Sequence, residues 1–324
     1  MYVQFIKILM VTAMTFVFLS CSSQIQTEKV KLALDWYPNA NHLGLYIALD
    51  EGYFDDENLD VEIYTPSDPS TVLQTVAAGS DEFGMNYQPD VLIARNEGVP
   101  VVSVLGMVQH PLNSMMVLKS SGIDSPDDLK GKKVGYPGIP WNEDALATML
   151  QSSGISIADV EVVNVGWELG SSLISNTVDA IVGAYYTHES IALENEGYPV
   201  NVIRMEDWGV PDYYELVLVT SEDYLSENPQ IVERFTRAVI KGYTKAINDP
   251  QAGVDTLIKY VPEIDADIDR PGANLLKTLW QDEDGNFGTQ KLEKWESFSN
   301  WMHENQITDN LVDPSKSFTD QYTK

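Results

Sequence analysis

The sequence predicts an α/β protein, in which short apolar strands alternate with helices. Near the start of the chain, an alternating apolar strand leads directly into a helical pattern, over residues 29–54. From residue 61 onward, strand and helix signals alternate at the spacing of βαβ units. The chain has 324 residues, which is long for a single hydrophobic core. We therefore expect two α/β domains.

The first strand and the turn after it form a predicted wall of a ligand pocket. Apolar residues occupy every second position from Val30 to Leu34, Pro38 ends the strand, and Asn41 precedes helical spacing. In open α/β sheets, ligands bind where strands end and helices begin. The side chains expected to line this crevice are Asp35, Trp36, Tyr37, Asn39 and His42. For Asp35, Asn39 and His42, a purely local role in capping the turn or helix is an equally simple explanation.

The first α/β series extends to residue 107. The expected strands are 61–64, 83–87 and 99–107, and the expected helices are 69–78 and 89–96, which end at Gly79 and Gly98. The run 99–107 is continuously apolar, which is typical of a strand buried on both faces. The chain changes direction after Pro111, and 115–118 is expected as a strand that connects the domains.

A second series begins with a capped helical turn at 125–129 and a strand at 133–136. The expected helices that follow are 143–152, 169–175 and 188–196, and the expected strands are 160–165 and 180–184. The run 214–219 resembles 115–118, so we expect these two strands to cross between the domains. Helices 229–247, 251–260 and 292–304 come last, and the tail after Asp313 is expected to be loosely ordered. The late aromatic residues expected to pack against the first domain are Trp280, Trp295, Phe298 and Trp301.

The N-terminus has the pattern of a bacterial export signal. Residues 8–19 form an uncharged run after a short basic start, too short to span a bilayer but suited to a signal-peptide core. The sequence Phe18-Leu19-Ser20-Cys21 resembles a lipoprotein cleavage box, so residues 1–21 are expected as the signal and Cys21 as the lipidated residue. The alternative is an ordinary secretory signal with an incidental cysteine. Because Cys21 is the only cysteine, we expect no disulfide and no thiolate chemistry.

Composition and motifs exclude several classes of function. The formal net charge of -29 argues against nucleic acid and anionic lipid as partners, because both would be repelled. The sequence contains no Gly-x-Ser-x-Gly or His-Glu-x-x-His motif, and its histidines lack metal-ligand spacing. The loop 135–140 lacks the Lys-Ser or Lys-Thr of a phosphate loop, and Glu143 follows it. A neutral or cationic ligand is therefore expected, with no metal and no cofactor.

Four segments resemble the solute-binding proteins of ABC importers: LDWYPNANHLGLYIALDEGYF, GSDEFGMNY, DLKGKKVGYPG and VDAIVGAYYTHE. The first is similar to the branch that binds thiamine pyrimidine precursors such as formylaminopyrimidine and hydroxymethylpyrimidine. The resemblance implies a type II periplasmic-binding-protein fold, in which two α/β lobes joined by two crossings close on a ligand. The first lobe would comprise 28–114 plus 214–324, and the second 115–213.

An aminopyrimidine has flat π-faces and a polar edge, so its site needs aromatic plates and fixed polar groups. The candidate plates are Trp36, Tyr37, Tyr136, Tyr185 and Tyr186. Adjacent residues at a strand end point to opposite sides, so at least one of Tyr185 and Tyr186 should face the cleft. Glu189 is expected to accept from the exocyclic amine and to pair with a protonated ring nitrogen. Tyr87 is a further candidate, and Asp90 beside it is expected either to add a contact or to cap its helix.

The resemblance implies an extracytoplasmic, monomeric lipoprotein that captures a pyrimidine and delivers it to a permease driven by a separate ATPase subunit. Alternatives within the family are binding proteins for riboflavin, alkanesulfonate or taurine, and nitrate. An enzyme is the competing class, because a fungal pyrimidine synthase shares this two-lobed fold. That synthase carries a cysteine cluster and consumes one of its own histidines together with pyridoxal phosphate. Here the only cysteine is Cys21, and Asp90 stands where that histidine would fall. A His188–Glu189 acid–base pair is the remaining catalytic alternative.

Overall fold

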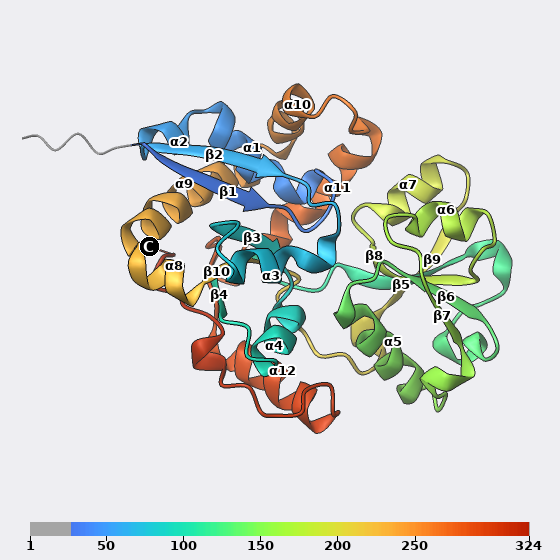
Figure 1. Ribbon diagram of the computed structural model, residues 1–324. Coiled ribbons are helices and arrows are strands. Elements are labelled where there is room, and N and C mark those ends of the chain that lie inside the picture. Colours follow the sequence, from blue (N-terminus) through green and yellow to red (C-terminus); the bar gives the residue numbers. More distant parts are fainter. Residues whose placement is uncertain (1–26, 324) are drawn as a thin grey trace, which may run out of the picture.

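The computed structural model describes residues 27–323, which form two α/β lobes, each built on a five-stranded mixed sheet (Figure 1). The strand order is β2-β1-β3-β10-β4 in the first sheet and β7-β6-β8-β5-β9 in the second. The first sheet contains β1 (Glu28–Ala33), β2 (Leu59–Tyr64), β3 (Phe83–Asn86), β4 (Val101–Val108) and β10 (Leu216–Ser221). The second contains β5 (Asn113–Leu118), β6 (Lys133–Tyr136), β7 (Glu161–Asn164), β8 (Ala180–Tyr185) and β9 (Val200–Arg204). The predicted two-lobed α/β fold is confirmed.

Helices cover both sheets (Figure 1). Those of the first series are α1 (Leu43–Asp50), α2 (Tyr53–Asp56), α3 (Val72–Ala77) and α4 (Gln88–Asn96). The second lobe carries α5 (Pro140–Ser152), α6 (Leu169–Ile174) and α7 (Glu189–Asn195). The chain then returns to the first lobe with α8 (Glu222–Glu227), α9 (Pro229–Asn248), α10 (Pro250–Tyr260), α11 (Ala266–Leu279) and α12 (Leu292–Glu304). Three elements of the fold, β9, α8 and α11, were not expected from the sequence.

Each sheet combines parallel and antiparallel strands. In the first, β1 runs parallel to β2 and β3, while β10 lies antiparallel between β3 and β4. In the second, β6 is parallel to β7 and β8, while β5 is antiparallel to β8 and β9. The two strands that were expected to cross between the domains therefore each lie within one sheet, and other segments connect the lobes. They span 109–112 and 205–215, and these two segments are called the crossings below.

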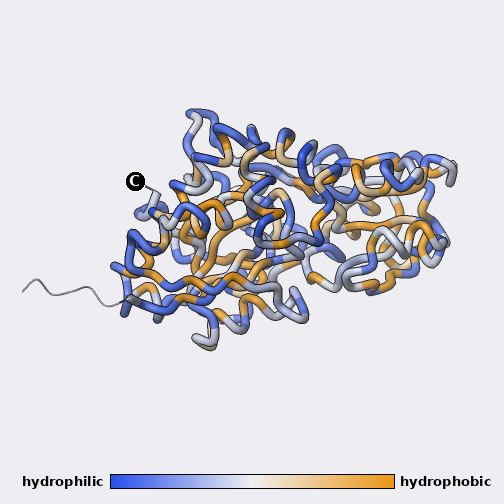
Figure 2. Tube along the Cα trace, turned by 90° about the horizontal axis from the view of Figure 1, so that it is seen from above, coloured by the Kyte–Doolittle hydropathy of each residue, from blue (hydrophilic) through white to orange (hydrophobic). Residues whose placement is uncertain are grey.

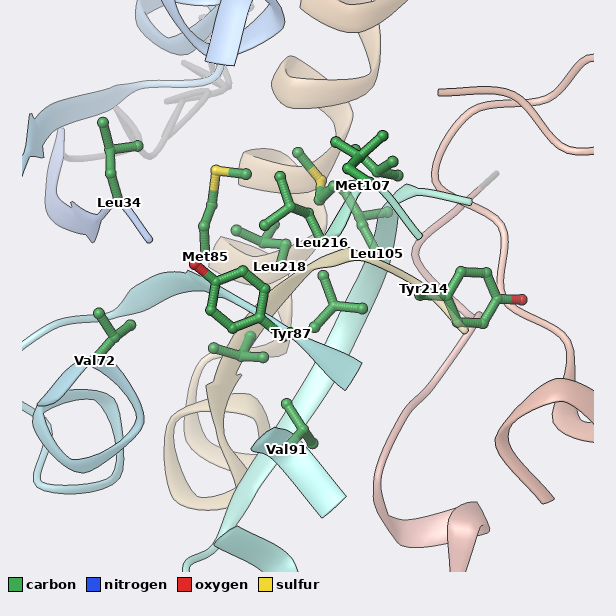
Figure 3. Close-up of a cluster of buried hydrophobic side chains, with 14 of the residues drawn as sticks. Leu34, Val72, Met85, Tyr87, Val91, Leu105, Met107, Tyr214, Leu216 and Leu218 are labelled. Atoms are coloured by element: carbon green, nitrogen blue, oxygen red, sulfur yellow. The ribbon is translucent and has the colours of Figure 1, made fainter. Parts of the chain in front are cut away.

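Apolar segments fill the interior of both lobes, and hydrophilic segments lie outside (Figure 2). All residues of β4 and β10 are buried, as the apolar run 99–107 predicts for β4. Figure 3 shows side chains from these strands, such as Leu105 and Leu216, gathered with Met85 and Leu34 in the hydrophobic core of the first lobe.

The chain beyond Asp313 packs against the last strand of the first sheet, so the expectation of a loose tail is wrong. The backbone N–H of Ser103 in β4 donates to the carbonyl of Ser317, and that of Thr319 donates to the carbonyl of Ser103, both at 2.8 Å. The Phe318 ring stacks on Trp295, with centroids 5.4 Å apart. The tail therefore covers an edge that would otherwise expose unpaired backbone groups.

The late helices dock onto the first lobe through buried aromatic residues. Trp280, Trp295 and Phe298 are fully buried, as expected. Trp301 lies at the boundary between the lobes, with its ring 5.2 Å from Phe298 and 6.1 Å from Trp141 of the second lobe.

Helices α1 and α9 approach each other closely because both carry a glycine at the contact. A Cβ atom at Gly242 would lie 2.0 Å from the carbonyl oxygen of Gly44. No side-chain rotation can relieve a clash with backbone, so the helices themselves would have to separate. Gly170 in α6 makes no such approach, since the nearest atom to its added Cβ, from Leu193, is 3.7 Å away.

We predict that Gly242→Ala lowers the free energy of unfolding by at least about 2 kcal/mol, the range of overpacking. Gly170→Ala is the matched control, and it should be neutral or stabilising by up to about 1 kcal/mol, because alanine favours helix. Urea unfolding followed by circular dichroism measures both. Equal effects of the two substitutions would contradict the close packing of α1 on α9.

Candidate functional site

A cavity lies between the lobes, where the crossings pass. The empty space among its lining atoms, open solvent included, is about 440 Å³. The first lobe contributes Asp35, Trp36, Asn39 and Tyr87. The crossings and the adjoining end of β5 contribute Glu215 and Asn113, and the second lobe contributes Pro137, Ile139, Trp141, Asn142, Gly183, Tyr185, His188 and Glu189.

Six of the residues predicted from the sequence line this one cavity, although they come from both lobes: Asp35, Trp36, Asn39, Tyr87, Tyr185 and Glu189. Their contact with a ligand stays a prediction. Four others lie outside the lining: Tyr37, His42, Tyr136 and Tyr186. Tyr37 is half exposed beside Trp36, and His42 is fully buried behind Asp35.

The two remaining tyrosines have other partners. Tyr136 ends β6, where a hydrogen bond to the Glu143 carboxylate and burial raise the pKa of its phenol to about 12. Tyr186 turns away from the cavity, and its ring lies 4.0 Å from the guanidinium carbon of Arg204. As expected for neighbouring residues at a strand end, only one of the pair, Tyr185, faces the cleft.

A hydrogen-bonded chain fixes the wall in the first lobe. The backbone N–H of Asn39 donates to Nδ1 of His42 at 3.1 Å, so in the neutral imidazole the proton is on Nε2. That nitrogen donates to Oδ1 of Asp35 at 3.0 Å. The other oxygen of Asp35 accepts from the Tyr87 hydroxyl at 3.2 Å. Burial, with the Asp35 charge second, raises the pKa of Tyr87 well above its ordinary value. The capping turn at 39–42 thus orients both Asp35 and Tyr87.

Glu215 joins the crossings at the base of the cavity. Its Oε2 accepts from the backbone N–H of Leu112 at 2.6 Å and of Asn113 at 2.8 Å, and from the Tyr213 hydroxyl at 3.1 Å. Its Oε1 accepts from the Tyr185 hydroxyl at 3.2 Å. Burial raises the pKa of the Glu215 carboxyl to about 7, although these donors act in the opposite direction.

The wall in the second lobe is built where β8 ends and α7 begins. The Glu189 carboxylate accepts from the backbone N–H of Tyr185 at 2.8 Å, and its other oxygen is 3.1 Å from Nδ1 of His188. Burial alone would lower the pKa of His188, but the Glu189 charge raises it above its ordinary value. Gly183 has φ of +94°, and a Cβ atom there would lie 2.7 Å from Cδ of Pro137. Glycine at this position therefore keeps β8 close to the loop beside the cavity.

Asp90 connects the lobes beside the cavity and does not line it. Its Oδ1 accepts from the backbone N–H of Trp141 at 3.2 Å. A residue of α4 thus provides the hydrogen-bond acceptor for an N–H group in the first turn of α5, which has no partner within its own helix. Burial raises the pKa of the Asp90 carboxyl to about 7. The sequence left open a ligand contact or a helix cap for Asp90, and the structure places it against the start of a helix in the other lobe.

The lining combines aromatic faces with carboxylates. Asp35 and Glu189 contribute carboxylates, Glu215 adds a carboxyl whose pKa is about 7, and no described lining residue is a lysine or arginine. Such a site suits a flat ligand that donates hydrogen bonds or carries positive charge. Within residues 27–323, no group of three or more His, Cys, Asp or Glu residues has an arrangement that could hold a metal ion. None of the helices in that range has both the length and the apolar character that crossing a membrane requires.

Sequence reasoning missed Glu215, Asn113 and Asn142, which line the cavity near the crossings. Asn113 donates to the side-chain oxygen of Asn142 at 2.5 Å. One signal was available for Glu215. It is a single acidic residue immediately before the apolar run of β10, where an isolated charge requires buried partners.

Two lobes on separate mixed sheets, joined by two crossings with an aromatic and acidic cavity between them, define the periplasmic-binding-protein fold. Residues 39–253 match the family model described as NMT1/THI5 like. The chain belongs to this family, as its sequence resemblance indicated.

Relatives within the family include binding proteins and enzymes. The chain is 40% identical to a formylaminopyrimidine-binding protein of Halalkalibacterium halodurans over 85% of this chain and 84% of that protein. It is 26% identical to a 4-amino-5-hydroxymethyl-2-methylpyrimidine phosphate synthase of Saccharomyces cerevisiae over 75% of this chain and 74% of the synthase. Among solved structures, the alkanesulfonate-binding protein of Xanthomonas axonopodis pv. citri superposes with a TM-score of 0.71. It is 14% identical and covers 91% of this chain and 99% of its own, which shows a shared fold.

We predict that burial of Glu215 and Asp90 makes the protein less stable as the pH rises from about 4 to 7. Their ordinary pKa values are 4.5 and 3.8, and both folded values are about 7. In this window the unfolded chain releases these protons while the folded protein retains them, so rising pH favours unfolding. Each group contributes at most about 1.4 kcal/mol per pH unit.

Asp90→Asn tests this linkage, because the amide oxygen can still accept from the Trp141 N–H. Urea unfolding at pH 4.5, 6 and 7.5 should show a smaller loss of stability in the variant than in the wild type. Asp60→Asn, at an exposed position of β2, should keep the slope of the wild type. Parallel slopes for Asp90→Asn and the wild type would contradict the raised pKa of Asp90.

Proposed function

We propose that the protein is an extracytoplasmic, lipid-anchored binding protein that captures a thiamine pyrimidine precursor, formylaminopyrimidine or hydroxymethylpyrimidine, and passes it to an ABC permease with its ATPase subunit. The observation that carries the proposal is the composition of the cavity. Trp36 from one lobe and Glu189 from the other line the same space, with no lysine or arginine in the lining. An aromatic plate and a carboxylate are the two groups that an aminopyrimidine requires.

The name of the Halalkalibacterium halodurans relative supports the pyrimidine as the ligand class. The charges of the cavity argue against the anionic solutes of the family. A sulfonate or nitrate would enter a space lined by Asp35, Glu189 and Glu215 without a cationic side chain, and would lose its hydration against like charges. A protonated aminopyrimidine would instead gain charge-assisted hydrogen bonds there.

Transport is favoured over synthesis by the residues that this chain lacks. The yeast relatives are named as phosphate synthases, and a synthase of a phosphorylated product needs cationic groups to hold phosphate. None lines the cavity among the described residues. The lipid anchor rests on Cys21, which lies outside the described residues, so mass spectrometry of the purified native protein is its test. The monomeric state is likewise part of the proposal and is tested by sedimentation.

Calorimetric titration tests the ligand class. Formylaminopyrimidine and hydroxymethylpyrimidine should bind, and each should raise the melting temperature, because a ligand of the folded form stabilises it. Taurine and nitrate should do neither. Binding of an anion in preference to both pyrimidines would overturn the proposal.

We predict that Glu189→Gln raises the Kd for the aminopyrimidine more than tenfold, because a hydrogen bond to a charged group contributes about 1.5 to 3 kcal/mol. The amide oxygen can still accept from the Tyr185 N–H, which preserves the local fold. Glu194→Gln, at an exposed position on the same helix, is the matched control and should bind like the wild type. An unchanged Kd in Glu189→Gln would remove this carboxylate from the site.

A further inference from the structure

Three aromatic rings meet at the edge of the cleft, and they come from both lobes. The Trp167 ring, from the turn between β7 and α6, has its centroid 4.2 Å from that of Trp36 and 4.2 Å from that of Tyr37. Trp36 and Tyr37 are themselves 6.0 Å apart in an edge-to-face arrangement. We call these three residues the mouth cluster.

The turn that carries Trp167 is held in one conformation by hydrogen bonds. The backbone N–H of Gly166 donates to the side-chain oxygen of Asn164 at 2.9 Å, and that of Glu168 donates to the carbonyl of Val165 at 3.1 Å. Gly166 has φ of +54°, which glycine adopts without strain. The backbone N–H of Val165 in turn donates to the carbonyl of Tyr136 at 2.9 Å, which ties the turn to β6. Trp167 therefore projects from a fixed point of the second lobe.

Trp167 makes its ring contacts with the first lobe. In residues 27–323, it is not among the side chains packed on either hydrophobic core, whereas Trp36 reaches over to the core of the second lobe. Trp36 lines the cavity and Trp167 does not. Trp167 thus covers a part of Trp36 outside the cavity lining, and it also borders a separate inter-lobe groove with Pro69 and Gly138. Separation of the lobes would break both ring contacts, because the partners lie on opposite sides of the cleft.

We propose that Trp167 determines how long the ligand stays bound, by holding the mouth cluster together in the closed form. The proposal rests on the proposed function, a hinged protein that encloses an aminopyrimidine. Aromatic pairs are stabilised by burial and by ring geometry, so the lobes must give up two such contacts before the ligand can leave. Because Trp167 does not line the cavity, it acts on the rate of dissociation and leaves the choice among ligands unchanged.

Stopped-flow measurements with formylaminopyrimidine on the full chain test this role, with Trp167→Ala and Trp167→Phe compared with the wild type. The alanine variant should dissociate about tenfold faster or more, which corresponds to about 1.4 kcal/mol of lost contact. The dissociation rate of the phenylalanine variant should lie between those of the wild type and the alanine variant, since it keeps an aromatic ring. Association rate constants should change much less than dissociation rate constants, because most effects of interface mutations are on dissociation. Tyr198→Ala removes an exposed aromatic of the same lobe and is the matched control, which should leave both rates unchanged.

An unchanged dissociation rate in Trp167→Ala, with an unchanged melting temperature, would overturn the proposal. A changed ranking of formylaminopyrimidine against hydroxymethylpyrimidine would also overturn it, because Trp167 would then contact the ligand. Failure of the wild type to bind either pyrimidine is a failure of the proposed function instead. The same rates are then measured with the solute that raises the melting temperature in a panel of taurine, nitrate and riboflavin, since the ring contacts do not depend on the ligand.

Discussion

The geometry of the cleft depends on one buried carboxylate, that of Glu215. It receives two backbone N–H groups from the first crossing and its margin, and two tyrosine hydroxyls. The charged form of this carboxyl has no cationic partner and is costly to bury, which raises its pKa to about 7, and its hydrogen-bond donors offset part of that cost. Hydrogen bonds to a charged group contribute about 1.5 to 3 kcal/mol, more than those between neutral groups. Glu215 therefore fixes the two crossings to each other. It also orients the Tyr185 side chain, next to the crossings that join the lobes.

In each lobe, the wall of the cavity places a carboxylate beside a histidine. Asp35 is oriented by His42 in the first lobe, and Glu189 lies beside His188 in the second. The net charge of -29 has less influence on the ligand than these few groups, because exposed charges are screened within about 8 Å at physiological ionic strength. Charges inside the cavity act through a medium of lower dielectric constant and are screened less. The proposed preference for a cationic or hydrogen-bond-donating ligand therefore rests on the local carboxylates and not on overall acidity.

The sequence was informative where local rules decide the structure. The turn after β1 was located by Pro38 and the apolar alternation before it, and most strands and helices follow from their periodicity. Helix α11 was missed because Pro271 lies in its interior and acidic residues begin it. Glu215 and Asn113 were missed because their place at the cavity depends on how the two crossings pass each other, which no local pattern records. Tyr37 and His42 were predicted to line the cavity because their neighbours in the turn do. The backbone of the turn instead leaves Tyr37 half exposed and buries His42.

The position of β10 between β3 and β4 has a consequence for how the chain acquires its structure. All strands of the second lobe lie between residues 113 and 204, so this lobe can form from one continuous stretch of chain. The first sheet instead has a gap in its middle until residues 216–221 are available, after the whole second lobe has been made. Long-range strand pairing is slow, so the topology sets the order of folding. The second lobe, which is formed by the middle of the chain, folds early. The first lobe contains the start of the described chain but is completed last.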